Sequence, residues 1–298
     1  MPELPDITIY VEALESRIRG QCLKRIQVRS PFLLRTVVPP LDSITGRRVT
    51  EIRCMGKRIV FGFERDSWLV LHLMIAGRLH WLNVAESPRK NCLASFEFEG
   101  GWLTLTEAGT KRRASLHLFD SKVTLAAHDP GGFEVMGSSV EEFAKVLTRS
   151  NHTLKRALTD PRLFSGMGNA YSDEILHRAR LSPVALTQKL TKPQVAQLHA
   201  ACVETMREWI TRLREEAAGN FREKVIAFRP EMAVHGKFGQ PCPVCGAKVQ
   251  RIRYASNETN YCPKCQTGGR LLADRSLSLL LKKDWPKTPE ELEELRKP

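Results

Sequence analysis

The chain has 298 residues, a formal net charge of +13 and 42% hydrophobic residues. This length predicts two domains with room for a small third module, and the composition excludes disorder for most of the chain. The most apolar stretch, residues 68–77, is too short to span a bilayer and carries His72. The excess of 46 Lys and Arg over 33 Asp and Glu favours a polyanionic partner: nucleic acid, an acidic membrane surface or a polyanionic substrate.

The N-terminus and the cysteines indicate the cellular compartment of the protein. The N-terminus has no basic segment followed by an apolar run, so a secretory signal is not expected. Of the eight cysteines, four are scattered singly and four cluster near the C-terminus. This distribution is not a disulfide framework, and it predicts a reducing cytoplasm.

The first part of the chain alternates in a way typical of β structure, behind one helix. Residues 4–20 are predicted to form a helix, because Ile7, Val11, Leu14 and Ile18 recur at helical spacing before Gly20. Short β-rich segments follow, separated by turn residues. The predicted strands are 24–29, 49–54, 58–63, 68–73, 78–82, 93–98, 102–106, 115–119 and 122–126. This pattern predicts an antiparallel sandwich or barrel with a helix at its front.

The pattern becomes helical after a predicted linker at residues 129–132. Capping boxes at 139–142 and 191–194 predict two helix starts, and shorter helices are expected around 152–158 and 169–179. The helix after residue 191 carries one apolar stripe. Its members are Val195, Leu198, Cys202, Met206, Trp209 and Leu213. The last segment, 284–298, is acidic and proline-containing, and is expected to pack loosely or extend as a tail.

The clustered cysteines form a CxxC-x16-CxxC pattern, with Cys242 and Cys245 in the first pair and Cys262 and Cys265 in the second. Two CxxC turns can each present two thiolates to one tetrahedral zinc ion, and four protein ligands leave no open position for catalysis. We therefore predict one structural zinc, against a redox pair or chance. The site could simply staple a small module, but lysines and arginines crowd the hairpin between the pairs, where they could follow phosphates.

Motifs from both ends of the chain together resemble one family. They are PELPD at 2–6, GK at 56–57, GMGNAYSDE at 166–174 and VHGKFGQPCPVC at 234–245. In this order they are similar to the formamidopyrimidine-DNA glycosylase and endonuclease VIII family, over most of the chain. The resemblance implies an α+β multidomain fold. Its expected parts are a catalytic β-sandwich (1–131), a helix–two-turn–helix domain (132–234), a zinc finger (235–270) and a C-terminal extension (271–298).

The resemblance assigns the catalytic roles to Pro2, Glu3 and Lys57. Removal of Met1 would leave Pro2 with a free amine, which titrates at ~8 against ~10.4 for lysine and is more often neutral. Such an amine can attack C1′ of a nucleotide and form an imine, and Glu3 could act as general acid toward the sugar. The simpler interpretations are a helix-capping acid for Glu3 and a solvated strand-end lysine for Lys57.

The same resemblance predicts DNA contacts. Asn169, at a predicted helix start, would hold a phosphate, with a plain N-cap as the alternative. Glu174 matches a family position but could be a solvated helix residue. His72 is expected to be a satisfied core histidine. The predicted DNA-binding residues are Lys155, Asn169, Lys237, Arg253, Arg112, Arg113, Ile75 and Asn257.

The sequence departs from the family pattern where the lesion would be read. Asn257 stands where the zinc-finger hairpin usually carries an arginine, so that clamp is weaker or is supplied by Arg251 or Arg253. Ile75 replaces the methionine that fills the void of the flipped base. Residues 111–115 retain arginines but no aromatic wedge.

These features predict a base-excision-repair DNA glycosylase with abasic-site lyase activity. The protein would be a cytoplasmic, nucleoid-associated monomer of bacterial type that binds damaged DNA and no membrane. The preferred lesion stays open among oxidised pyrimidines, ring-opened purines, abasic sites and bulkier adducts. A non-catalytic protein that binds damaged or branched DNA is the main alternative, and a zinc-ribbon RNA-binding protein is a weaker one.

Overall fold

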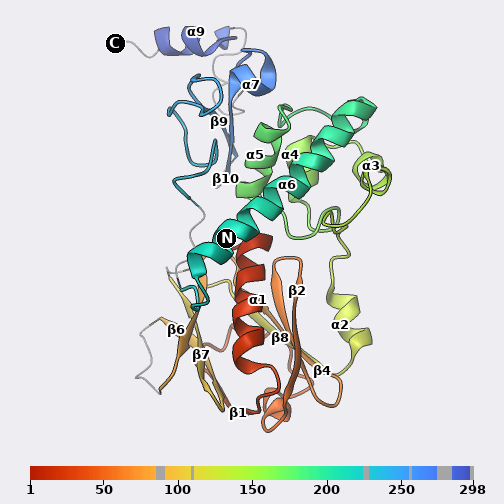
Figure 1. The fold of residues 1–298 in the computed structure, drawn as a ribbon, viewed down its shortest axis with the longest axis vertical. Helices are drawn as coiled ribbons and strands as arrows, with labels where there is room; N and C mark the ends of the chain where they lie inside the picture. Colours follow the sequence, from red (N-terminus) through yellow and green to blue (C-terminus); the bar gives the residue numbers. More distant parts are fainter. Residues whose placement is uncertain (85–90, 109–110, 224–227, 255–256, 274–283, 296–298) are drawn as a thin grey trace. The chain divides into compact units, whose positions relative to one another are not determined.

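A computed structural model describes residues 1–84, 91–108, 111–223, 228–254, 257–273 and 284–295 (Figure 1). The chain divides into two compact units. The first comprises residues 1–131 and 207–227, and the second comprises 132–206 and 228–298. The predicted C-terminal extension falls partly outside the described residues, at 274–283 and 296–298.

The leading helix, α1 (Leu4–Ile18), confirms the prediction from apolar spacing. Ile7, Leu14 and Ile18 are buried, and α1 packs against strand β2. The helix ends before Gly20, which has a φ of +77° that L-residues rarely adopt. The first residues of the chain are therefore fixed by a helix that is anchored in the core of the first unit.

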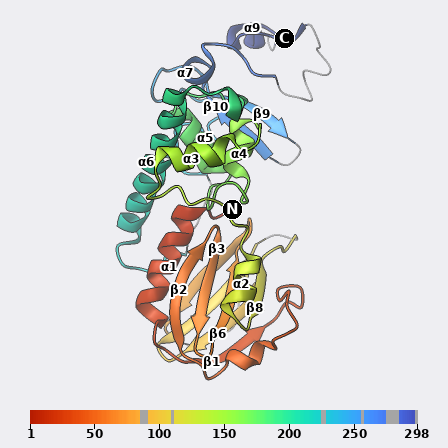
Figure 2. The ribbon, with the colours of Figure 1, turned by 90° about the vertical axis from the view of Figure 1, so that its right-hand side faces the viewer.

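Two four-stranded antiparallel sheets form the first unit (Figure 2). One runs in the order β2 (Val49–Met55), β3 (Arg58–Phe63), β4 (Ser67–His72) and β8 (Ser115–Phe119). The other runs β1 (Leu23–Val28), β6 (Cys92–Phe98), β7 (Gly101–Glu107) and β5 (Gly77–Leu82). A short 3-10 helix, η1 (Leu41–Ile44), follows β1. Side chains from both sheets and α1 share one hydrophobic cluster, so the predicted antiparallel sandwich is confirmed.

The predicted strand at 122–126 is wrong, because this segment is helix α2 (Lys122–His128). Ser121 caps the helix by accepting a hydrogen bond from the Thr124 amide at 3.2 Å. Leu125 is the buried residue of α2 and packs with the apolar outer side chains of β3 and β4. A local cap and one buried leucine thus outweigh the β propensity of a short sequence.

The second unit is mainly helical in its first half (Figure 1). Its elements are α3 (Val140–Thr148), α4 (Leu154–Thr159), α5 (Asn169–Arg178), the 3-10 helix η2 (Thr187–Lys189) and α6 (Lys192–Ala217). Both predicted capping boxes are present, since Ser139 and Thr191 exchange hydrogen bonds with Glu142 and Gln194. The six residues of the predicted apolar stripe on α6 are all buried. Helix α6 contributes residues to both units.

The second half of this unit is a small β module that carries the four clustered cysteines, and it is called the cysteine module. Strands β9 (Gln250–Tyr254) and β10 (Asn257–Tyr261) pair in an antiparallel hairpin, and α7 (Pro263–Thr267) follows. A short exposed helix, α9 (Pro289–Glu294), lies in the acidic C-terminal segment. Within the described residues, no helix combines the length and apolar character needed to cross a bilayer.

Candidate functional site

The first candidate group lies at the start of α1. Glu3 is the N-cap residue of this helix and is 2% exposed, and Pro2 is buried beside it. The Glu3 amide donates to Asp6 Oδ2 at 3.1 Å, within a capping box between the two acids. The capping role that we considered for Glu3 is therefore present. Glu3 is also a carboxylate next to the chain terminus, held almost out of water.

Lys57 is positioned by a two-residue turn between β2 and β3. Gly56 takes the first central position with a φ of +60°, which is typical of a type II′ hairpin turn. Burial lowers the pKa of Lys57, Glu3 raises it, and Arg58 lowers it. Lys57 and Glu3 are therefore close enough to interact electrostatically, and Lys57 is not a fully solvated strand-end lysine.

The chain terminus shares this environment. Burial lowers the pKa of the Met1 amine, Glu3 and Asp6 oppose the shift, and Arg78 and Lys57 add to it. A larger fraction of the amine is therefore neutral at a given pH than for a solvated terminus. An amine, a buried acid and a partly desolvated lysine are thus gathered in one part of the first unit.

The loop between β4 and β5 presents Ile75 to solvent. Ile75 is 57% exposed, and Met74 next to it has a φ of +54°. The Gly77 amide donates to the Leu73 carbonyl at 2.9 Å, and a Cβ on Gly77 would lie 2.3 Å from that oxygen. The glycine is therefore required for a tight loop that projects an apolar side chain outward.

The segment that carries Arg112 and Arg113 is held by an acid that the sequence did not reveal. Both arginines are exposed. Glu107, 1% exposed at the end of β7, accepts hydrogen bonds from the amides of Arg113 and Ala114 at 2.9 and 3.0 Å. This buried carboxylate fixes the backbone at Arg113 and Ala114, and so it positions the segment that carries the two arginines.

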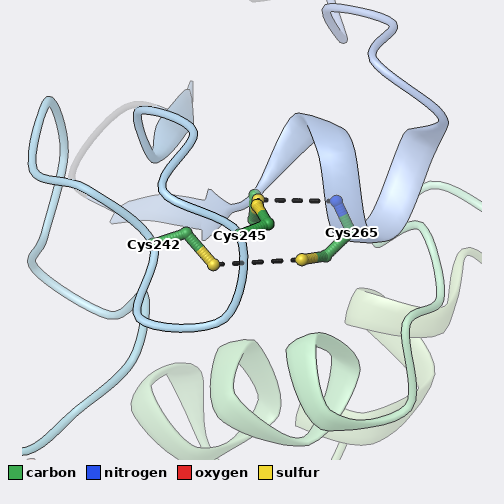
Figure 3. Close-up of side chains that lie close together, drawn as sticks. Cys242, Cys245 and Cys265 are labelled. Carbon is green, nitrogen blue, oxygen red and sulfur yellow. Dashed lines mark hydrogen bonds between the residues drawn. The ribbon is translucent and has the colours of Figure 1, made fainter.

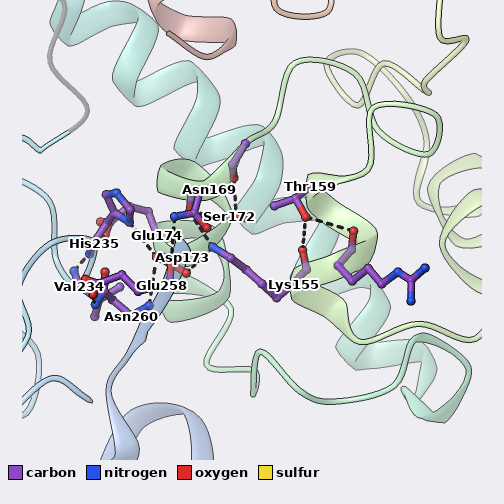
Figure 4. A network of polar contacts seen from close by, with 12 residues as sticks. Lys155, Thr159, Asn169, Ser172, Asp173, Glu174, Val234, His235, Glu258 and Asn260 are labelled. Carbon is purple, nitrogen blue, oxygen red and sulfur yellow. Dashed lines mark hydrogen bonds and ion pairs between the residues drawn. The ribbon is translucent and has the colours of Figure 1, made fainter. Parts of the chain in front are cut away.

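In the second unit, Lys155 is joined to α5 (Figure 4). Its Nζ donates to the Asn169 carbonyl at 2.6 Å and to Asp173 Oδ1 at 2.5 Å. Asp173, which is 0% exposed, places its other oxygen 2.8 Å from His235 Nδ1 and 3.1 Å from the Asn260 amide. Asp173, His235 and Asn260 were missed in the sequence analysis, although the i, i+4 spacing of Asn169 and Asp173 was a usable signal.

Glu174 is not the solvated helix residue considered above, since it is only 8% exposed. Its carboxylate accepts hydrogen bonds from the amides of Ala233, Val234 and His235 at 2.7 to 2.9 Å. Burial raises the pKa of Glu174, and the three amides oppose that shift. Glu174 therefore anchors the chain that leads into the cysteine module.

Asn169 is the first helical residue of α5, and Gly168 is the N-cap, so the plain N-cap interpretation of Asn169 is wrong. The Asn169 Nδ2 group instead donates to the Glu258 carbonyl at 3.0 Å. This hydrogen bond ties the start of α5 to strand β10.

The four clustered cysteines fit one metal ion, and Figure 3 shows Cys242, Cys245 and Cys265 of this group. The ligand atoms of Cys242, Cys245, Cys262 and Cys265 all lie within 4.8 Å of one another. The Sγ atoms of Cys242 and Cys265 are 3.9 Å apart, and those of Cys245 and Cys262 are 3.3 Å apart. A zinc ion with bonds of about 2.3 Å to sulfur requires tetrahedral edges of about 3.8 Å. The donor set therefore suits a single structural zinc.

The hairpin does not place another arginine where Asn257 stands. Asn257 is exposed and opens β10 opposite Tyr254. Asn257 pairs with Tyr254, whereas Arg253 and Arg251 belong to the pairs that point to the opposite side. Their side chains therefore lie on the other face of the hairpin from Asn257. Arg251 also stacks 4.1 Å from the Phe238 ring centroid and pairs with Glu258 at 3.3 Å. Arg253 is exposed, and Lys237 is half-buried in the turn after His235.

His72 is not the satisfied core histidine that we expected. Among the described residues, its buried Nε2 has no hydrogen-bond partner. Burial, followed by Arg58 and Lys57, lowers the pKa of His72 to about 4. His117 has a pKa of about 4, for which burial is again the main cause, and its ring lies 4.4 Å from that of His128. These histidines form a group on the outer face of β4 and β8.

Comparisons with known proteins agree with this arrangement. The sequence profile of the formamidopyrimidine-DNA glycosylase N-terminal domain matches residues 1–167. The chain belongs to the formamidopyrimidine-DNA glycosylase family. The helix–two-turn–helix domain of the same family matches residues 133–217, and a zinc finger found in this family and in isoleucyl-tRNA synthetases matches 239–268. The predicted family, fold class and zinc finger are confirmed.

Individual relatives in this family cover the chain to different extents. A formamidopyrimidine-DNA glycosylase from Heliobacterium modesticaldum is 30% identical, over 89% of this chain and 100% of its own length. A Mycobacterium tuberculosis protein described as formamidopyrimidine-DNA glycosylase-like is 38% identical, over 51% of this chain and 94% of its own. The Lactococcus lactis glycosylase bound to Fapy-dG DNA has a TM-score of 0.79 and 27% identity, over 89% of this chain and 100% of that chain.

Proposed function

We propose that this chain is a base-excision-repair DNA glycosylase that also cleaves the resulting abasic site. Family membership supports the glycosylase class, since relatives are named formamidopyrimidine-DNA glycosylases and solved relatives hold damaged DNA. The observation that carries the catalytic part is Glu3, an acid 2% exposed and adjacent to Pro2 at the chain terminus. The proposal assigns catalysis to residues 1–131, with the helical domain at 132–234, the zinc finger at 235–270 and the extension at 271–298.

The nucleophile is the Pro2 amine after loss of Met1. Its nitrogen attacks C1′ of the damaged nucleotide, the bond from C1′ to the base breaks, and the base leaves with the proton that the attacking amine loses. Glu3 protonates the ring oxygen of the sugar, which opens and leaves an iminium ion between Pro2 and C1′. Loss of a proton from C2′ then expels the 3′ phosphate, a second elimination expels the 5′ phosphate, and water releases the sugar fragment from Pro2.

The environment of the terminus supports this chemistry. Burial lowers the pKa of the Met1 amine, Arg78 and Lys57 add to that shift, and Glu3 and Asp6 oppose it. Loss of Met1 would leave the Pro2 amine next to Glu3 in the same part of the first unit, and a neutral amine is the nucleophilic form. Lys57, on its tight turn, would bind the phosphate next to the lesion.

Residues of both units would contact DNA. Lys155 and Asn169 would contact the phosphate backbone, and so would the cations Lys237 and Arg253 of the cysteine module. Arg112, Arg113 and Ile75 project from loops and would fill the space that a flipped nucleotide leaves in the duplex. Asn257 can donate a hydrogen bond to phosphate but brings no charge, so the hold on the lesion phosphate is weaker than an arginine would give.

Trapping the iminium ion tests this proposal. The full chain is incubated with a duplex that contains one abasic site, sodium borohydride is added, and the adduct is mapped by peptide mass spectrometry. We expect a covalent adduct on the peptide that begins with Pro2. The matched control is a chain with a non-cleavable extension before Met1, which converts the amine to an amide and should give no adduct.

The outcomes separate the candidate functions. Tight binding to the abasic duplex without any adduct would support the non-catalytic DNA-binding alternative, which the uncharged Asn257 favours. An adduct on a lysine would retain lyase activity but overturn the role of Pro2. A panel of duplexes with oxidised pyrimidines, ring-opened purines, 8-oxoguanine and bulkier adducts then identifies the preferred base.

A further inference from the structure

Helix α5 presents a row of polar side chains to the cysteine module. Asn169, Asp173 and His177 follow one another at intervals of four residues and therefore share one face of the helix. Asn169 Nδ2 contacts the Glu258 carbonyl at 3.0 Å, and Asp173 accepts from the Asn260 amide at 3.1 Å. The third member of the row reaches the cysteine cluster itself.

His177 contacts one of the four zinc ligands directly. Its Nε2 lies 3.2 Å from Cys242 Sγ, and the two residues are 6% and 2% exposed. A zinc-bound cysteine is a thiolate and has no proton to give, so the hydrogen of this contact must come from the imidazole. We infer that His177 is a positioning residue of the zinc site, which donates its Nε2–H to the Cys242 thiolate and links the metal to helix α5.

The charge of the site gives this hydrogen bond a role. Four thiolates around one divalent zinc ion carry a net charge of −2, and burial makes that charge costly unless N–H groups are directed at the sulfur atoms. The Cys265 amide is directed at Cys262 Sγ, at 3.5 Å. His177 supplies a side-chain donor from a different element of the chain. Residues around a metal that orient its ligands commonly influence metal affinity.

A second contact joins α5 to the same module. Gln266 accepts from the Cys262 amide at 2.8 Å and donates to the Leu181 carbonyl, just beyond α5, at 3.0 Å. The end of α5 is therefore tied to both cysteine pairs, and its start carries Asn169 and the Asp173–Lys155 ion pair. Zinc occupancy should thus stabilise α5, which carries Asn169 and binds Lys155 of α4 through Asp173.

Cobalt substitution in the full chain tests the role of His177. His177→Phe keeps the ring but removes the donor, whereas His177→Gln retains an N–H at a similar distance from the backbone. A hydrogen bond lowers the energy of sulfur lone pairs, so His177→Phe should move the thiolate-to-cobalt charge-transfer band to lower energy. It should also speed the loss of zinc to a chromogenic chelator by about tenfold. His177→Gln should restore both properties.

Two results would overturn the inference. The first is a charge-transfer band at the same energy in all three proteins, or equal zinc loss from the Phe and Gln variants, since a packing role makes no distinction by donor. The second comes from the wild-type protein and does not depend on a variant that folds. Nitrogen NMR of the zinc-loaded chain should show His177 protonated at Nε2, and an unprotonated Nε2 contradicts the donor role.

Discussion

The two units hold their candidate functional residues by different means. In the first unit, Glu3 is placed by the start of a helix and Lys57 by a two-residue turn, both of which are local structures. In the second unit, Asp173 and Glu174 bind amides that lie 59 to 87 positions away in the sequence. The first arrangement positions each residue through its immediate neighbours in the chain. The second uses its buried charges mainly to join α5 to the cysteine module.

Replacing the acid beside the nucleophile should give the largest effect. Glu3→Gln removes the proton donor for ring opening, and we expect strand cleavage at an abasic site to slow by about 10²- to 10⁴-fold in single-turnover assays. The thermal midpoint should change little, because glutamine can still accept a hydrogen bond at the N-cap. Glu12→Gln is the control: Glu12 lies on the same helix and pairs with Arg214 on the surface at 2.6 Å. Unchanged strand cleavage by Glu3→Gln would refute the catalytic role.

Breaking the buried ion pair should lower stability more than any surface change in the second unit. Lys155→Met leaves Asp173, which is 0% exposed, without its ammonium partner. We expect a loss of about 3–5 kcal/mol in the free energy of unfolding, measured by denaturant titration. Lys145→Met, at an exposed position on α3, should stay within about 0.5 kcal/mol of wild type. A small effect at Lys155 would mean that the network is not structural.

Acid should weaken the first unit through its histidines. His72 and His117 have pKa values of about 4 in the folded chain, mainly through burial, against about 6.5 when unfolded. The unfolded chain therefore binds more protons between pH 6.5 and 4, so stability is lost as the pH falls through this window.

The variant His117→Phe tests this link to pH. It should reduce proton uptake on unfolding at pH 5 by about one proton, measured from the dependence of the thermal midpoint on pH. Phe119→Leu changes packing in the same group but removes no titrating side chain, and it should leave the pH dependence as in wild type. An unaltered pH dependence in His117→Phe would show that His117 titrates alike in both states.

Placing an arginine at position 257 should give the smallest change. Asn257→Arg adds one cation to an exposed position of the hairpin. We expect tighter binding to abasic DNA and a salt dependence that is steeper by about one phosphate contact, measured by fluorescence anisotropy at several salt concentrations. Asn257→Gln is the uncharged control. Equal affinity, salt dependence and lesion preference in Asn257→Arg and wild type would show that this position does not contact phosphate.

The sequence by itself determined the features that depend on neighbouring residues. The apolar spacing in 4–20, the capping boxes at 139–142 and 191–194 and the CxxC pairs were sufficient for helices and a zinc site. Each of these signals is complete within a few positions, because helical periodicity, caps and paired thiolates are short-range patterns. The order of the four motifs along the chain identified the family. The strand predicted at 122–126 was wrong, because the β propensity of this segment was weaker than the effect of a helix cap and one buried leucine.

Only the tertiary structure decided how the polar residues of the second unit are used. Nothing near Asp173 in the sequence indicates that His235 and Asn260 will share its carboxylate, or that His177 will reach Cys242. Likewise, Glu107 is one acid among many until the fold directs two amides at it. Burial makes an unpaired polar group costly, so partners are selected by the spatial arrangement of distant elements, which a local pattern does not contain.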